Sequence, residues 1–403
     1  MRTGLAVAAL LPALALADDA TPAAPIEARR VPVEDPGGHA LDRFSAALRR
    51  VAAGEERAIA RVAVLGDSHI AADLFTGALR RRLQARLGDA GHGFVLLGSA
   101  WPLYRHLDVE HGATASFATR RLRPRDHEPF RFGLGGGVST ATQGAVAWVG
   151  TAARGPVGRR VSRFEVFYET EPGGGALELR LDGQRVATLE TSSPSHQAAY
   201  RVVEAPDGRH RLEIESMGPG PTAVYGAVLE RSGPGVVVDS LGVPALAALH
   251  LSSSDPTLLA EHLCRRAHDL VVFAFGTNDV RWEAMDLSTY RASLARLLTR
   301  IRTGAPRASC LVLGPIDRRY RSTDGVWNAS LDEVIERQRG AAVDAGCAFW
   351  DQRAAMGGPG SMARWMVPRP RFTLRDGVHL SGRGYDVLAG ALASELLAPI
   401  DSP

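Results

Sequence analysis

The sequence contains no lysine: every one of its 47 basic residues is arginine. This absence excludes a lysine nucleophile and any chemistry that passes through a lysine Schiff base. The formal net charge is only +3 over 403 residues, which excludes the strong basic excess typical of nucleic-acid binding. No stretch reaches the roughly eighteen apolar residues that cross a membrane as a helix. We therefore expect no nucleic-acid partner and no integral membrane contact.

Cysteine is also scarce, with Cys264, Cys310 and Cys347 the only three. Their spacing matches no metal site, and the histidines form no His-Glu-x-x-His pattern, so we expect no metal. The glycine run at 133–137 lacks the strand-to-helix context of a phosphate loop, and no cofactor is expected. Cys310 and Cys347 each open an apolar run, which leaves a disulfide between neighbouring strands open. Buried free thiols are the default expectation.

The first seventeen residues have the features of a signal peptide. Arg2 supplies a positive charge, residues 4–16 an apolar run, and Ala15-Leu16-Ala17 a small-x-small cleavage site. Residues 18–38 are rich in Ala, Pro, Asp and Glu, and are predicted to be a flexible lead-in. The sequence therefore predicts an exported protein, periplasmic or secreted after signal-peptide cleavage.

Strand-like and helical patterns alternate through most of the remaining chain, which predicts a parallel α/β sandwich. The expected strands are 61–66, 235–241, 270–276, 309–314 and 347–351. The expected helices are 41–53, 71–87, 256–267, 287–303, 328–345 and 382–397. Such folds bind ligands at the carboxyl ends of their strands.

Residues 99–233 differ from this pattern, because short alternating runs at 145–149, 163–169, 176–182, 185–190, 199–203, 210–215 and 223–230 are separated by Gly, Pro and Asp-Gly turns. We expect an inserted all-β, jelly-roll-like domain there, similar to a carbohydrate-binding module. The α/β domain would then consist of 39–98 and 234–403. The aromatics of the insertion, if exposed, are candidates for stacking on sugars. They are Trp101, Tyr104, Trp148 and Tyr168.

Three motifs stand out in this frame. Gly66-Asp67-Ser68 ends the first strand, Gly276-Thr277-Asn278-Asp279 follows the third, and Asp376-Gly-Val-His379 lies near the C-terminus. Together they resemble blocks I, III and V of the SGNH (GDSL-type) hydrolase superfamily. The sequence around Ser68 is most similar to that of the periplasmic peptidoglycan O-acetylesterase branch. The resemblance implies a three-layer α/β/α, flavodoxin-like sheet.

The resemblance also implies a role for each motif. Ser68 would be the nucleophile, His379 its general base, and Asp376 the acceptor that fixes the histidine tautomer. The oxyanion would be stabilised by the N–H of Ser68, the N–H of Gly242 and the side chain of Asn278. Gly242 departs from the family pattern, because Val243-Pro244-Ala245 follows it. Gly91 and Gly93 are the alternatives for that glycine.

These inferences predict a serine esterase that removes O-acetyl groups from a cell-wall glycan, with peptidoglycan as the first substrate expected. A polysaccharide O-acetyltransferase with the same triad is an alternative, because a sugar hydroxyl can replace water as acceptor. A deacetylase or carboxylesterase of another glycan or lipid is a further alternative. A non-catalytic glycan-binding protein is the least consistent with a complete set of motifs.

Overall fold

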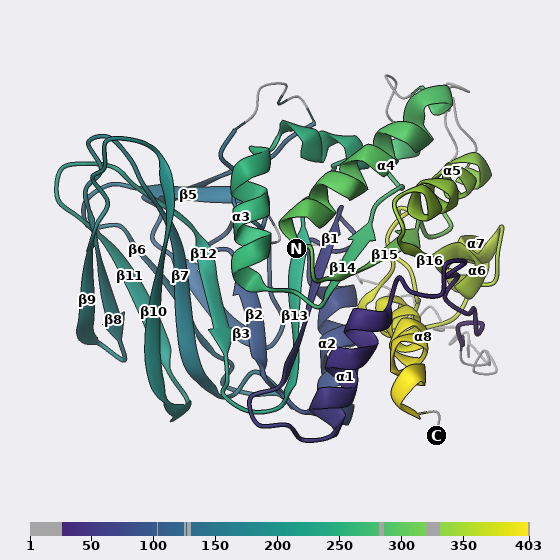
Figure 1. Ribbon diagram of the computed structural model, residues 1–403, viewed down its shortest axis with the longest axis horizontal. Helices are drawn as coiled ribbons and strands as arrows, with labels where there is room; N and C mark the ends of the chain where they lie inside the picture. Colours follow the sequence, from purple (N-terminus) through teal and green to yellow (C-terminus); the bar gives the residue numbers. More distant parts are fainter. Residues whose placement is uncertain are drawn as a thin grey trace, which may run out of the picture.

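The computed structural model describes residues 26–102, 104–124, 126, 130–281, 286–319 and 331–401. The predicted signal peptide lies outside the described residues. An α/β unit and a pair of antiparallel sheets lie side by side (Figure 1). The chain leaves the α/β unit after its first strand and helix, and returns to it at the second strand.

The α/β unit is built on a five-stranded sheet in the order β13-β1-β14-β15-β16. All four neighbouring pairs are parallel. The strands are β1 (Ile59–Gly66), β13 (Gly235–Gly242), β14 (Leu270–Ala274), β15 (Ser309–Gly314) and β16 (Ala348–Asp351). The five predicted strands are confirmed, because each is a short run of β-branched and apolar residues that is buried on both faces.

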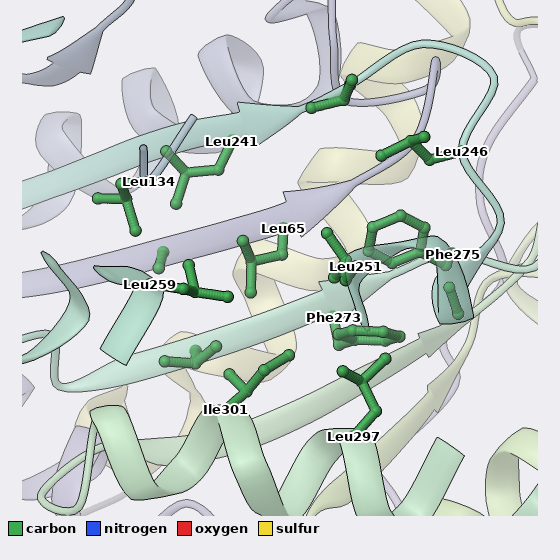
Figure 2. Packing of buried hydrophobic residues seen from close by; sticks show 14 of the residues in the cluster. Leu65, Leu134, Leu241, Leu246, Leu251, Leu259, Phe273, Phe275, Leu297 and Ile301 are labelled. Atoms are coloured by element: carbon green, nitrogen blue, oxygen red, sulfur yellow. The ribbon is translucent and has the colours of Figure 1, made fainter. Parts of the chain in front are cut away.

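Alternate residues of β1 point into different cores. Ala63 and Leu65 belong to the core under α3 (Pro256–Arg266), α4 (Leu287–Gly304) and α5 (Leu331–Asp344). Figure 2 shows Leu65 and Phe273 facing Leu297 and Ile301 of α4. Val62 and Val64 belong to the core under the helices of the opposite face. These are α1 (Asp42–Ala52), α2 (Leu74–Leu87) and α8 (Gly382–Asp401). The predicted three-layer α/β/α fold is thus confirmed.

Four further short helical segments follow strands or loops: η1 (Ala248–Ser253), η2 (Asp279–Arg281), α6 (Gln352–Ala355) and α7 (Ser361–Trp365). The sequence patterns did not predict them, because one or two turns are too short to show a periodicity. Among the helices described, none is both long and apolar enough to cross a membrane.

The antiparallel strands form two sheets with a shared apolar core. One has the order β10-β7-β12-β5-β4, with β2 also paired to β12, and the other the order β3-β6-β11-β8-β9. Their bounds are β2 (Gly91–Val95), β3 (Val109–Ala113), β4 (Phe117–Arg121), β5 (Gly137–Ala141), β6 (Val146–Thr151), β7 (Val161–Thr170), β8 (Ala176–Leu181), β9 (Gln184–Glu190), β10 (Gln197–Gly208), β11 (Arg211–Met217) and β12 (Thr222–Glu230). Phe164 and Val166 of one sheet pack with Leu212 and Ile214 of the other.

The strands β6 to β12 match the predicted β runs, whereas β2 to β5 were not predicted. Each of these four has only five residues, and three of them contain glycine. β2 precedes the predicted start of the insertion at Ser99, yet it pairs with β12. The first strand of the antiparallel sheets therefore begins directly after α2.

A buried ion network joins the two units. Asp239 of β13 is fully buried and accepts hydrogen bonds from Arg266, His268 and the Phe94 N–H. Arg266 also binds Glu230 of β12 at 2.7 Å. Desolvation alone would raise the pKa of Glu230, but Arg266 and Arg61 lower it to about 2. The carboxylates therefore stay ionised, and the network fixes the insertion against the sheet.

The described part of the predicted flexible lead-in is ordered along the sheet edge, which corrects that expectation for residues 26–38. Glu34 forms an antiparallel bridge with Phe349 of β16, with backbone hydrogen bonds of 2.8 Å in both directions. The indole N–H of Trp350 donates to the Val31 carbonyl. These contacts cover an edge strand that would otherwise present unpaired backbone groups.

Cys310 and Cys347 form a disulfide, so the default expectation of free buried thiols is wrong for this pair. The register explains it: Leu311 lies opposite Ala348, which places the two preceding residues side by side at the start of β15 and β16. Cys264 is a free thiol and is exposed, not buried.

Candidate functional site

Three neighbouring strands end at the same edge of the central sheet. Gly66, the last residue of β1, lies opposite Gly242 of β13 on one side and Ala274 of β14 on the other. Ser68, Gly242 and Asn278 therefore lie at or just after the ends of three adjacent strands, at the same edge of the sheet. This is the edge where α/β folds bind their ligands.

Ser68 lies in a turn, not at a helix N-terminus. The Ile70 and Ala71 N–H groups both donate to the Asp67 carbonyl, and α2 begins only at Leu74. The predicted start near Ala71 is wrong because Asp73 has a left-handed backbone, with φ of 54°, which interrupts the right-handed helix. The turn leaves the Ser68 side chain partly exposed at the sheet edge.

The Ser68 hydroxyl lies 2.8 Å from Nε2 of His379, and Nδ1 of His379 lies 2.7 Å from Oδ2 of Asp376. The structure thus brings Ser68 to a histidine that lies 311 positions later in the sequence. The distances are those of good hydrogen bonds. The arrangement is a serine, an imidazole and a carboxylate in a line, which is the geometry of a nucleophile activated by a general base.

The loop before α8 builds the acid–histidine pair locally. Oδ1 of Asp376 accepts the backbone N–H groups of Val378 and His379, both at 2.9 Å, so the carboxylate folds the turn that carries its own partner. Gly377 adopts a φ of 68°, and a Cβ there would lie 2.5 Å from the Arg319 carbonyl. Partial burial favours a raised pKa of Asp376, but the hydrogen bonds from His379 and Val378 outweigh it and lower the pKa. Asp376 is therefore ionised at neutral pH.

Gly242 packs directly on the turn that follows Ser68. A Cβ at this position would lie 2.4 Å from the Ala71 nitrogen and 2.6 Å from the Ile70 carbonyl carbon, so only glycine fits. The alternatives lie elsewhere: Gly91 packs on Glu230 of β12, and Gly93 on Asp239, which pairs with Ala63 well before the strand end. Of the three glycines, Gly242 is the one at the Ser68 edge.

Asn278 follows β14 and is held by its own neighbours. Its Nδ2 donates one hydrogen bond, of 3.0 Å, to the Leu246 carbonyl. A primary amide has two N–H donors. Within the described ranges, no residue accepts the second one, which leaves it available to a ligand.

A cavity of about 580 Å³ opens beside Ser68 and His379. Trp101, Tyr104 and Arg105 form part of its lining, together with Asp376. The expectation of exposed aromatics is wrong for most of the four named above: Trp101, Tyr104 and Tyr168 are 7–8% exposed. Trp101 and Tyr104 still line the cavity, and their rings pack edge to face with centroids 4.7 Å apart.

A second group of side chains, which the sequence did not indicate, lies next to His379. It consists of His69, Tyr385 and Asp67. The His69 ring lies 5.0 Å from the His379 ring, and its Nδ1 hydrogen-bonds the Tyr385 hydroxyl at 2.7 Å. Burial, with a contribution from His379, lowers the pKa of His69 to about 3, so this imidazole stays neutral. Burial raises the pKa of Asp67 to about 7, aided by Asp279 nearby. The imidazole that lies next to His379 is therefore uncharged.

The structure also brings Asp73, His92 and His106 together, with possible ligand atoms within 4.8 Å of one another. The sequence spacing gave no sign of this cluster. The Asp73 carboxylate, however, is bound by Arg80 at 2.6 Å and by the Leu107 N–H at 2.9 Å. A guanidinium in that position would repel a cation. The geometry therefore favours a structural ion pair that holds the start of α2.

Another cavity, of about 720 Å³, lies at the other end of the sheet, near the first residues of β1. Its wall is rich in arginine, but the buried carboxylates of Glu165 and Glu230 each bind two of these guanidinium groups. It belongs to the ion network between the two units and is remote from Ser68.

Comparison with known proteins agrees with this geometry. A sequence profile described as the GDSL-like Lipase/Acylhydrolase family matches residues 208–387. Among solved structures, a peptidoglycan O-acetylesterase superposes with a TM-score of 0.74 and 25% sequence identity, over 90% of this chain and 97% of its own. The chain belongs to the SGNH hydrolases. The matched range spans the segments of Asn278, Asp376 and His379, whereas Ser68 precedes it.

Two other solved structures match this SGNH esterase less well. A lipase/acylhydrolase from Enterococcus faecalis is 20% identical, with a TM-score of 0.32 over 41% of this chain and 77% of its own. A family two carbohydrate esterase from Clostridium thermocellum is 11% identical, with a TM-score of 0.32 over 68% of this chain and 99% of its own. No curated protein matches the sequence.

Proposed function

We propose that this SGNH hydrolase is an exported serine esterase that removes O-acetyl groups from a cell-wall glycan, with peptidoglycan as its substrate. The hydrogen-bonded line from Ser68 through His379 to Asp376, open to a cavity of about 580 Å³, carries the proposal. The likeness to a peptidoglycan O-acetylesterase over 90% of the chain supports the choice of acyl group and polymer.

In the first half-reaction, the Ser68 Oγ attacks the acetyl carbonyl carbon while its proton passes to Nε2 of His379. The resulting imidazolium is stabilised by the ionised Asp376, whose Oδ2 accepts a hydrogen bond from the Nδ1–H group. The carbonyl oxygen takes up the negative charge. When the tetrahedral intermediate collapses, the C–O bond to the sugar breaks and the sugar oxygen takes the proton from Nε2, which leaves an acetyl-enzyme.

In the second half-reaction, water attacks the acetyl-enzyme. Nε2 of His379 accepts the water proton, and the Ser68 oxygen recovers a proton as acetate leaves. In both halves we assign the oxyanion to three donors, namely the N–H of Ser68, the N–H of Gly242 and the second N–H of the Asn278 amide. A preorganised set of such donors lowers the barrier because no solvent has to reorient as charge develops.

The antiparallel sheets are proposed to present the polymer to Ser68. Trp101 and Tyr104, which follow β2 in the chain, line the cavity beside Ser68. Changes in this wall should reduce kcat/KM for a polymeric glycan and spare a small acetyl ester.

The test is acetate release from O-acetylated peptidoglycan by the wild-type protein and by Ser68→Ala. We expect turnover to collapse in the variant by at least about a thousandfold, with an unchanged melting temperature, because a partly exposed hydroxyl contributes little packing. Wild-type turnover in Ser68→Ala would refute the nucleophile assignment. Adding acceptor glycan separates hydrolysis from transfer: transfer that exceeds acetate release would replace the esterase by a transferase.

A further inference from the structure

The segment that follows β13, residues 243–247, is called the β13 loop below. It connects the two groups assigned to the oxyanion that do not belong to Ser68. The loop starts directly after Gly242, and its Leu246 carbonyl accepts the hydrogen bond of 3.0 Å from the Asn278 side chain. Directly after the loop, the Ala248 N–H donates to the Asp279 carboxylate at 3.1 Å. A shift of the β13 loop would therefore displace Gly242 and Asn278 together.

The β13 loop contains a backbone conformation that its own sequence does not favour. Ala245 has a φ of 68°, in the left-handed region, where the Cβ of an L-residue comes too close to the following carbonyl oxygen. The Ala245 side chain is exposed, so its own packing does not hold the backbone there. Such a conformation persists only where the surrounding contacts impose it. The neighbours of the β13 loop therefore determine its shape.

Several of these contacts come from the antiparallel sheets. Arg121, the last residue of β4, donates from Nη1 to the Pro244 carbonyl and to the Leu122 carbonyl, both at 3.2 Å. Gly136 packs on the preceding residue of the loop, because a Cβ at Gly136 would lie 2.4 Å from Cγ2 of Val243. The Leu122 N–H donates to the Gly136 carbonyl at 2.9 Å, which ties these two contacts to each other. The end of β4 is thus seated on the β13 loop.

We propose that Arg121 is a positioning residue, which holds the β13 loop so that Gly242 and Asn278 point their donors at the oxyanion. This rests on the proposed function, which assigns those two donors. Arg121 is not among the described residues that line the cavity beside Ser68, so its effect passes through the loop. A guanidinium suits this task, because its rigid, charged fork donates to carbonyl oxygens in a fixed direction. The antiparallel sheets therefore complete the reaction site itself, in addition to presenting the polymer.

The first measurement is hydrolysis of para-nitrophenyl acetate, which is too small to need presentation by the antiparallel sheets. In Arg121→Gln we expect kcat to fall about ten- to a hundredfold, with KM within a factor of about two. The expected loss is smaller than the roughly 10²–10³ that follows removal of one oxyanion donor, because the donors are displaced and not deleted.

The second measurement reports on the oxyanion directly. Trifluoroacetone is attacked by the Ser68 Oγ: a C–O bond forms, the serine proton passes to His379, and the ketone oxygen takes the negative charge. The resulting hemiketal needs the same donors as the tetrahedral intermediate. The inhibition constant in Arg121→Gln should therefore rise by about the same factor as kcat/KM falls.

Two variants serve as controls. Arg120→Gln makes the same change of charge one residue earlier in β4, where the exposed guanidinium lies over the Phe130 ring at 3.7 Å. It should keep the wild-type kcat and inhibition constant. Arg121→Lys keeps the charge and a donor but loses the fork, so it should recover part of kcat and remain at least about threefold below the wild type.

The outcomes are separable from those of the proposed function. A folded Arg121→Gln protein with wild-type kcat and inhibition constant would overturn the inference and leave the esterase intact, even if its melting temperature fell. A loss confined to a polymeric acetylated glycan would also overturn it. If Arg121→Gln does not fold, Arg121→Lys decides: matched losses in both constants support the inference, and wild-type values overturn it. Failure of the wild-type protein to release acetate from the small ester and from O-acetylated peptidoglycan would overturn the proposed function as well.

Discussion

Replacing Asp376 by Asn removes one charge from the array and keeps its size. In the native arrangement, Oδ1 accepts hydrogen bonds from two backbone N–H groups, and Oδ2 accepts one from the Nδ1–H group of His379. An Asn side chain has one oxygen and one NH₂ group, so it cannot accept on both sides. Because the oxygen serves the two N–H groups that fold the turn, the NH₂ faces His379 and favours the tautomer with its proton on Nε2. That nitrogen can then no longer take the proton of Ser68.

The magnitude follows from the lost charge. Two unit charges about 4 Å apart interact by about 1 kcal/mol in water and about 4 kcal/mol near a protein surface. The Asp376 side chain is 44% exposed, which places the loss of imidazolium stabilisation between these limits. Together with the wrong tautomer, we expect kcat to fall by about 10²- to 10⁴-fold.

The assay is hydrolysis of a chromogenic acetyl ester across a pH series, with Ser68→Ala as the inactive reference. KM should change little, because Asp376 is expected to act on the imidazole and not on the substrate. Equal melting temperatures would show that the turn has survived. A kcat within a factor of about three of the wild type, in a folded Asp376→Asn protein, would refute the reasoning.

Three other changes have defined outcomes. Asn278→Ala should lower kcat by roughly 10²–10³ with a smaller effect on KM, and an effect on KM alone would move it from the oxyanion to substrate binding. Asp67 has a pKa of about 7 in the folded protein, above its value in the unfolded chain, so its ionisation lowers the stability of the fold as pH rises from about 4 to 7. The melting temperature of Asp67→Asn should therefore rise relative to that of the wild type over this pH interval. A difference in melting temperature that does not depend on pH would contradict this. Asp239→Ala leaves Arg266 buried with Glu230 as its remaining carboxylate partner. Denaturant titrations should show a loss of about 3–5 kcal/mol in the free energy of unfolding. A loss below about 1 kcal/mol would show that the network is dispensable.

The sequence predicted the central sheet well because its strands are buried on both faces and therefore read as continuous apolar runs. The motifs that contain Ser68, Asn278 and His379 could be located for a related reason. Each of them directly follows an apolar strand or precedes a long helix. The helix start at Leu74 could not be predicted, because the left-handed backbone of Asp73 depends on Arg80 and on the Leu107 N–H.

Contacts between distant segments account for the other differences. The disulfide between Cys310 and Cys347 depends on the register of two strands that a helix separates. The cavity wall of Trp101 and Tyr104 depends on the packing of the insertion against the sheet edge. Neither is encoded in a local pattern, and both appear only when the whole chain is folded.

The distance along the chain between Ser68 and His379, 311 positions, has a consequence for the history of each molecule. A ribosome makes the serine 311 positions before the imidazole, which lies just before α8. Until α8 has docked on α1 and α2, the chain carries a hydroxyl with no base beside it. A chain cut short anywhere before Asp376 is therefore chemically inert. Folding of the segment that carries Asp376 and His379 thus completes the arrangement that we propose for catalysis.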